Sequence, residues 1–141
     1  MAEDNEDDVF LLQQAFVNSG VKSLLNFVRD GSETIRYLTG QGGFENRQNF
    51  PFPGLILLDL KMPKLNGFEV LQWVRKHPEL KRLLIVVLTS SAEPCDVDLA
   101  YELGANSYLR KPSNFNELVQ MMGRIETYWL ETNIFPTFYR I

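Results

Sequence analysis

Three polar residues of complementary chemistry stand at the ends of apolar stretches in this sequence of 141 residues. They are Asp59 after residues 55–58, Thr89 after residues 83–88, and Lys111 shortly after residues 107–109. Continuous apolar runs are typical of strands buried on both faces of a parallel sheet, and the carboxyl ends of such strands meet at one edge. We therefore expect a carboxylate, a hydroxyl group and an ammonium group to lie close together.

Two acidic residues near the start of the chain, Glu3 and Asp4, are expected beside Asp59. Carboxylates packed together repel one another unless a divalent cation neutralises them. Mg²⁺ suits such a cluster because it prefers a few carboxylates, water and phosphoryl oxygens. Asp59 can then act as a nucleophile and form an acyl phosphate. The Lys111 ammonium would balance the phosphoryl charge, and the Thr89 hydroxyl would donate to a phosphoryl oxygen.

The elements that must position these residues alternate along the chain. Apolar runs predict strands over residues 24–28, 55–58, 83–88 and 107–109. Capping residues and the spacing of apolar residues predict helices between residues 5 and 20, over 32–38, between 66 and 77, over 94–103, and from 114 to 129. This alternation predicts a parallel sheet with helices on both faces.

A long loop is predicted over residues 41–53, which contain two glycines, two prolines and three phenylalanines. Two interpretations stay open for it. The loop is either an ordinary surface insertion or a partner-facing or stabilising flap that uses Phe44, Phe50 and Phe52.

Composition and charge limit the class of protein. Apolar residues make up 45% of the chain and charged residues 23%, which is typical of one globular domain and not of disordered or fibrous proteins. A net charge of −4 argues against a nucleic-acid surface, and the single cysteine, Cys95, excludes an internal disulfide. Because no signal peptide or long apolar span is evident, we expect a soluble cytoplasmic protein.

Four motifs in this order and spacing resemble the receiver domain of two-component response regulators. They are EDN near the start, DLKMPKLNG around Asp59, LTSS at Thr89, and SYLRKP, which contains Lys111. The resemblance covers nearly all of the chain. The long loop before Asp59 and the ending ETYWLETNIFP are similar to the single-domain receivers paired with phytochrome-type sensor histidine kinases.

The resemblance implies a flavodoxin-like, doubly wound α/β fold with strand order 2-1-3-4-5. It assigns Asp59 as the phosphoacceptor and implies that Mg²⁺ is bound by Glu3, Asp4, Asp59 and the Lys61 carbonyl oxygen. The phosphoryl group would be contacted by Thr89, Ser90 and Lys111. The switch residues would be Thr89 and Tyr108. Tyr108 is expected to turn inward as Thr89 moves toward the phosphoryl group. The bond from Lys111 to Pro112 is expected to be cis.

The first strand of that fold is largely absent from this sequence, because only Met1 and Ala2 precede the acidic pair. The strand is central in the order 2-1-3-4-5, so two neighbours would be left with unpaired backbone groups. A misassigned start or a truncated copy would explain this. Alternatively the apolar tail fills the position, in its own subunit or a partner's, in which case residues 137–141 would form backbone hydrogen bonds with the sheet.

We predict a receiver domain over residues 1–131 and an apolar tail over 132–141 that serves docking, dimerisation or filling of the sheet. The receiver is expected to take a phosphoryl group from a sensor histidine kinase on Asp59 and to signal by protein contact, without enzymatic turnover of its own. We expect a homodimer through the surface around Cys95 to Tyr108, the final helix and the C-terminal aromatic residues, and we expect no nucleic-acid or membrane partner.

Two alternatives from other classes stay open. A pseudo-receiver acting as a dimerising scaffold would follow if Glu3 and Asp4 were misplaced. A phosphatase with an aspartyl-phosphate intermediate usually has a second acid two residues beyond the nucleophile, but Lys61 occupies that position.

Overall fold

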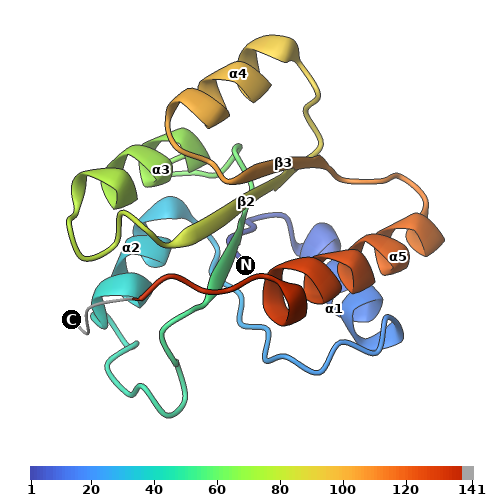
Figure 1. Cartoon of the computed structure of the whole chain (residues 1–141), viewed down its shortest axis with the longest axis horizontal. Helices are drawn as coiled ribbons and strands as arrows, with labels where there is room; N and C mark the ends of the chain where they lie inside the picture. The colour runs from blue at the N-terminus through green and yellow to red at the C-terminus, as the bar shows by residue number, and fades with distance from the viewer. Residues whose placement is uncertain (138–141) are drawn as a thin grey trace.

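Three parallel strands form the sheet in the part of the chain that the computed structural model describes, residues 1–137. The strands are β1 (Leu55–Leu58), β2 (Leu84–Thr89) and β3 (Ser107–Arg110), in the spatial order β1-β2-β3 (Figure 1). Leu57 pairs with Val86, and Val87 pairs with Tyr108. The runs LILL and LIVVL therefore lie side by side, which explains why both are continuously apolar.

Ala2 extends this sheet beyond β1. It forms parallel bridges with both Val28 and Leu58. The Ala2 N–H donates to the Leu57 carbonyl at 2.9 Å, and the Glu3 N–H donates to the Val28 carbonyl at 3.0 Å. The sheet thus continues through Ala2 to Val28, and the complete spatial order is the predicted 2-1-3-4-5.

The strand predicted over residues 24–28 is reduced to the single bridge at Val28. A strand is held by its neighbours, and in the described chain only Met1, Ala2 and Glu3 stand between this segment and β1. Pairing therefore stops where those residues stop.

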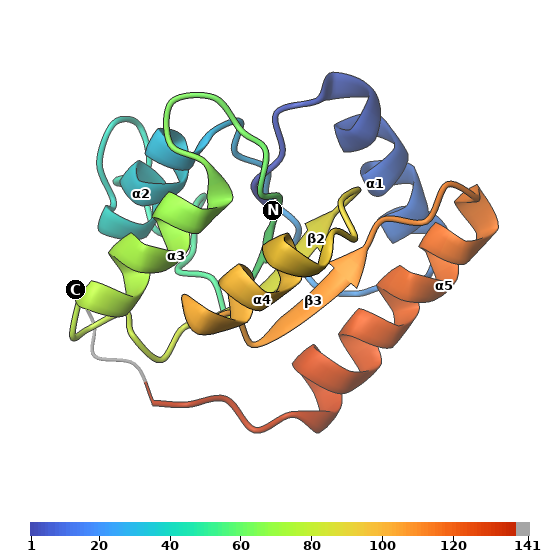
Figure 2. The ribbon, with the colours of Figure 1, turned by 90° about the horizontal axis from the view of Figure 1, so that it is seen from above.

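Helices cover both faces of the sheet, as predicted (Figure 2). One face carries α1 (Glu6–Asn18) and α5 (Phe115–Ile125), and the other carries α2 (Gly31–Thr39), α3 (Gly67–Lys76) and α4 (Pro94–Glu102). Each face buries its own apolar cluster. Leu12, Leu57, Val86 and Met122 belong to the first, and Leu38, Ile56, Val70 and Ile85 to the second.

The final helix ends earlier than predicted. α5 ends at Ile125 and continues as a π-helical segment, η1 (Glu126–Thr132). The Thr132 hydroxyl donates to the Thr127 carbonyl at 2.6 Å, and the Asn133 N–H donates to the Tyr128 carbonyl at 2.7 Å. Apolar spacing predicts where a helix packs, but not this wider winding.

The loop over residues 41–53 is tied to the domain. The Phe44 ring packs against Tyr37 and Phe50 with centroids 5.0 Å away in each case. The Arg47 guanidinium donates to the carbonyls of Tyr37 and Leu38 at the end of α2. These contacts favour the stabilising flap over a loose surface insertion.

The described part of the tail, residues 133–137, lies at the surface. Ile134 is 92% exposed, and the Phe135 ring lies against Gly54. No sheet hydrogen bond is formed by this part of the tail. The rest of the predicted strand, residues 138–141, lies outside the described residues.

Candidate functional site

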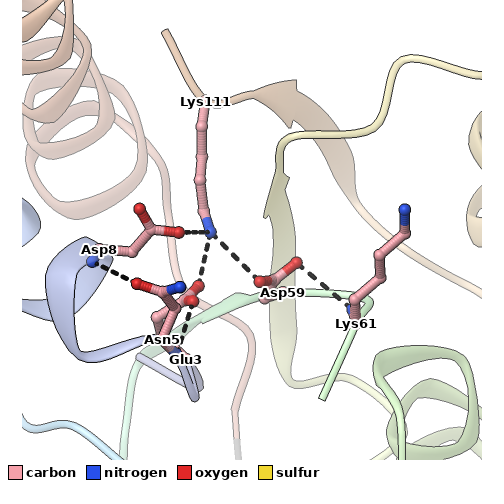
Figure 3. A network of polar contacts seen from close by, with 6 residues as sticks. All are labelled: Glu3, Asn5, Asp8, Asp59, Lys61 and Lys111. Atoms are coloured by element: carbon pink, nitrogen blue, oxygen red, sulfur yellow. Dashed lines mark hydrogen bonds and ion pairs between the residues drawn. The ribbon is translucent and has the colours of Figure 1, made fainter. Parts of the chain in front are cut away.

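The carboxyl ends of the strands bring the predicted polar residues together. The Lys111 N–H donates to the Thr89 carbonyl at 2.7 Å, which holds the segment after β3 beside the end of β2. The Lys111 ammonium then reaches Asp59 Oδ2 at 3.2 Å (Figure 3). It also contacts Glu3 Oε2 at 2.6 Å and Asp8 Oδ2 at 3.1 Å. One partly buried cation therefore pairs with carboxylates from three segments of the chain.

Glu3 and Asp4 lie beside Asp59, although very little of a first strand is present to carry them. The bridges of Ala2 fix the backbone on both sides, and Glu3 is fully buried. Oxygens of Glu3, Asp4 and Asp59 all lie within 4.8 Å of one another. The displacement of Glu3 and Asp4 that would motivate a pseudo-receiver is therefore not observed.

The two buried carboxyl groups differ in protonation. Burial is the largest influence on Glu3 and, with the neighbouring Asp59 carboxylate, raises the pKa of Glu3 to about 7. Burial acts in the same direction on Asp59, but contacts with Glu3 and Lys111 outweigh it and hold the pKa of Asp59 below its usual value. The pKa of Lys111 is raised because its ion pairs outweigh the effect of burial. Asp59 is therefore the ionised member at neutral pH.

This donor set fits a divalent cation. Three carboxylates converge on one small volume, where they repel one another unless a cation neutralises them. Hard oxygen ligands of this kind suit Mg²⁺. Lys61 turns its side chain away from the cluster, while its N–H donates to Asp59 Oδ1 at 3.4 Å (Figure 3). The Lys61 carbonyl as a ligand stays a prediction.

Thr89 and its neighbours have distinct environments. The Thr89 side chain is buried and helps to hold the pKa of Asp59 low, and its hydroxyl forms no hydrogen bond of good geometry among residues 1–137. Ser90 is exposed, whereas the Ser91 hydroxyl donates to Asp96 at 2.6 Å. The Tyr108 ring is half-buried, and its hydroxyl donates to the Ser91 carbonyl at 2.9 Å.

The peptide bond from Lys111 to Pro112 is trans, so the expectation of a cis bond is wrong. The Lys111 side chain reaches the carboxylates from the trans backbone.

A family model described as the response regulator receiver domain matches residues 1–123. The chain belongs to this family. The response regulator Rcp1 of Synechocystis sp. is 42% identical to this receiver over 136 residues, which cover 96% of the chain and 90% of Rcp1.

Solved structures of receivers resemble this one closely. The phosphorylated cyanobacterial phytochrome response regulator RcpA matches with a TM-score of 0.86 and 40% identity, covering 96% of this receiver and 95% of RcpA. The Mn²⁺-bound form of Rcp1 matches with a TM-score of 0.83 and 42% identity, covering 96% of each chain. Within residues 1–137, no helix of this receiver has the length and apolar character needed to cross a membrane.

Two residues of the receiver site were not predicted. Asp8, in the first turn of α1, pairs with Lys111. Gly67 lies so close to the site that a Cβ there would lie 2.4 Å from the Asp59 carbonyl oxygen. The acidic residues at the start of α1 were a signal for Asp8. The close contact at Gly67 depends on how closely α3 approaches the end of β1, which no local sequence pattern predicts.

Proposed function

We propose that this receiver accepts a phosphoryl group on Asp59 from the phosphohistidine of a sensor histidine kinase, with Mg²⁺ as cofactor. The observation that carries the proposal is the ionised Asp59 carboxylate 3.2 Å from the Lys111 ammonium, with Glu3 and Asp4 beside it. Membership in the receiver family supports the same reaction.

In the transfer, an Asp59 oxygen attacks phosphorus and forms an O–P bond. The P–N bond to the histidine breaks, and its electron pair passes to the imidazole nitrogen. Asp59 has no proton to lose, because its pKa is held low. When bound by Glu3, Asp4 and Asp59, Mg²⁺ would neutralise phosphoryl oxygens.

Lys111 and Thr89 would serve the phosphorylated form. Lys111 can exchange a carboxylate contact for a phosphoryl oxygen without leaving its place, because it already lies among several acceptors. The buried Thr89 hydroxyl can donate to another phosphoryl oxygen, and the exposed Ser90 can contribute a third contact. Movement of Thr89 would be passed to Tyr108, which now bonds to Ser91.

The kinase partner is proposed to be of the phytochrome type, because RcpA is named as a phytochrome response regulator. The output is proposed to be a homodimer through α4, β3 and α5. That face carries exposed apolar side chains, among them Leu99, Tyr101 and Phe115, with Tyr128 following in η1. Light scattering with and without phosphorylation would test this, and an unchanged monomer mass would contradict it.

The central test is incubation with acetyl phosphate and Mg²⁺, followed by intact-mass measurement. We expect one added phosphoryl group, which Asp59→Asn abolishes and the exposed control Asp7→Asn retains. Removal of divalent cations with EDTA should suppress the gain. A gain of mass that persists in Asp59→Asn would show that Asp59 is not the acceptor.

A further inference from the structure

The loop of residues 61–66 leads from the end of β1 to the start of α3. Its base is closed, because the Gly67 N–H donates to the Leu60 carbonyl at 2.9 Å. At the same end, the Lys61 N–H donates to Asp59 Oδ1 at 3.4 Å (Figure 3). The loop therefore starts and ends beside Asp59, and its conformation decides where the Lys61 carbonyl, the predicted Mg²⁺ ligand, can lie.

The other side of the loop rests on the start of α2. The Gly31 N–H donates to the Leu65 carbonyl at 3.1 Å. The two residues are so close that a Cβ at Gly31 would lie 2.1 Å from that carbonyl oxygen. Next to this contact, the Lys64 ammonium pairs with Asp30 Oδ2 at 3.3 Å. A backbone hydrogen bond and an ion pair therefore join two consecutive residues of the loop to two consecutive residues at the start of α2.

Asp30 is itself fixed by its helix. It is the buried N-cap of α2, and its Oδ1 accepts from the Glu33 N–H at 2.7 Å, which leaves Oδ2 for Lys64. Burial alone would raise the pKa of Asp30, but the contacts with Glu33 and Lys64 outweigh it and lower the pKa. Asp30 therefore presents a fixed negative charge to the loop.

Lys64 has a backbone conformation that a residue with a Cβ disfavours. Its φ is 65°, and within residues 1–137 it is the only residue other than glycine with a positive φ. Such a conformation persists where the surrounding contacts impose it. Because the Lys64 side chain is 64% exposed, the ion pair with Asp30 contributes little to overall stability. Its effect is on the conformation of the loop.

We propose that Asp30, Gly31 and Lys64 are positioning residues for the divalent cation, which hold residues 61–66 in one conformation before the ion binds. A ligand that is ordered in advance, here the Lys61 carbonyl, costs little conformational entropy on binding. Without these contacts the loop would have to be ordered by the ion, which would bind less tightly. This inference rests on the proposed Mg²⁺ site.

The test measures Mn²⁺ affinity of the whole chain, without a phosphoryl donor, from the EPR signal of the free ion. Asp30→Asn retains an oxygen acceptor for the Glu33 N–H and removes the anionic partner of Lys64. Lys64→Gly removes the ammonium group and relieves the left-handed backbone. Each should raise the Mn²⁺ dissociation constant about threefold or more. The double variant should have no larger effect than either single variant, because both remove the same contact.

The two substitutions also separate positioning from other causes. They change the net charge in opposite directions, so a long-range charge effect would weaken Mn²⁺ binding in Asp30→Asn and strengthen it in Lys64→Gly. Positioning weakens binding in both. The urea midpoint of Lys64→Gly in EDTA should not fall, because glycine adopts a positive φ freely. Its loss of affinity is then not a consequence of general destabilisation.

Gly31→Ala tests the backbone contact. The added Cβ would push the Leu65 carbonyl away from α2 and should weaken Mn²⁺ binding at least about tenfold. The matched control is Gly123→Ala in α5, where a Cβ meets nothing within 4 Å, and it should bind Mn²⁺ as the unaltered protein does. If Gly31→Ala fails to fold, Asp30→Asn and Lys64→Gly still decide the question.

Unchanged Mn²⁺ affinity in Asp30→Asn and Lys64→Gly, or opposite changes in the two, would overturn the proposal. Asp59→Asn is measured beside them. If it weakens Mn²⁺ binding while the other two variants do not, only the positioning role is wrong. If the unaltered protein binds no Mn²⁺, or Asp59→Asn binds it equally well, the proposed metal site is wrong and the positioning role is overturned with it.

Discussion

The Met1 amine and the Glu3 carboxyl group should oppose each other in the pH dependence of stability. The pKa of the amine falls from 8.0 to about 5 on folding, so between these values the unfolded chain binds more protons and stability rises with pH. The pKa of Glu3 rises from 4.5 to about 7, so between these values the folded chain binds more protons and stability falls with pH. The lowered pKa values of Asp30 and Asp59 act only below about pH 4.

The two effects have similar size. One pKa unit corresponds to about 1.4 kcal/mol, so between about pH 5 and pH 7 the amine should add about 2–3 kcal/mol to the free energy of unfolding. Glu3 should remove about 1–3 kcal/mol over the same range, the lower end reflecting screening by solvent and by Lys111. The unaltered protein should therefore show nearly constant stability.

Two modifications separate the contributions. In Glu3→Gln the free energy of unfolding should rise by about 2–3 kcal/mol from pH 5 to pH 7, because only the amine titrates. With the Met1 amine acetylated, it should fall by about 1–3 kcal/mol over that range. Urea unfolding without divalent cations measures both, on protein shown by intact mass to retain Met1. The same pH dependence in all three proteins would refute the assignment of these groups.

Three substitutions should change stability for local reasons. Gly67→Ala should lower the free energy of unfolding by about 1–3 kcal/mol because its Cβ would meet the Asp59 carbonyl, whereas Gly123→Ala, with nothing within 4 Å, should raise it by up to about 1 kcal/mol. Equal losses in urea unfolding would contradict this. Lys111→Met leaves buried carboxylates without a cation and should cost about 3–5 kcal/mol in EDTA, part of which Mg²⁺ restores. An unchanged midpoint in EDTA would show that the ion pairs are not stabilising.

The structure brings Asp59, Thr89 and Lys111 to one edge of the sheet, as the sequence predicted, for a physical reason. The apolar runs before Asp59 and Thr89 and the shorter one before Lys111 are local signals of strands, and parallel strands deliver their carboxyl ends to one edge. The contact of Asp8 with Lys111 was not predicted because it depends on the angle at which α1 packs over that edge of the sheet. This angle is set by packing between distant segments and not by any local pattern.

For residues 24–28 the local signal predicted more strand than the structure contains. The apolar residues there predicted a strand, but pairing is a property of two segments, and beside this one only Met1 to Glu3 are present. The winding of η1 and the trans bond before Pro112 likewise depend on the surrounding chain. Local propensity identified where strands are possible, while the number of available partners decided how much of each formed.

The favourable and unfavourable free-energy terms that anchor Glu3 are close to balance. Each main-chain hydrogen bond of residues 1–3 contributes about 0.5–1.5 kcal/mol, while ordering each residue costs about 1–2 kcal/mol. These terms nearly cancel, so the burial of Ala2 and the ion pair between Glu3 and Lys111 decide whether the segment stays in place. Because Glu3 follows directly on Ala2, the bridges that hold Ala2 between Val28 and Leu58 also fix a carboxylate of the proposed Mg²⁺ site.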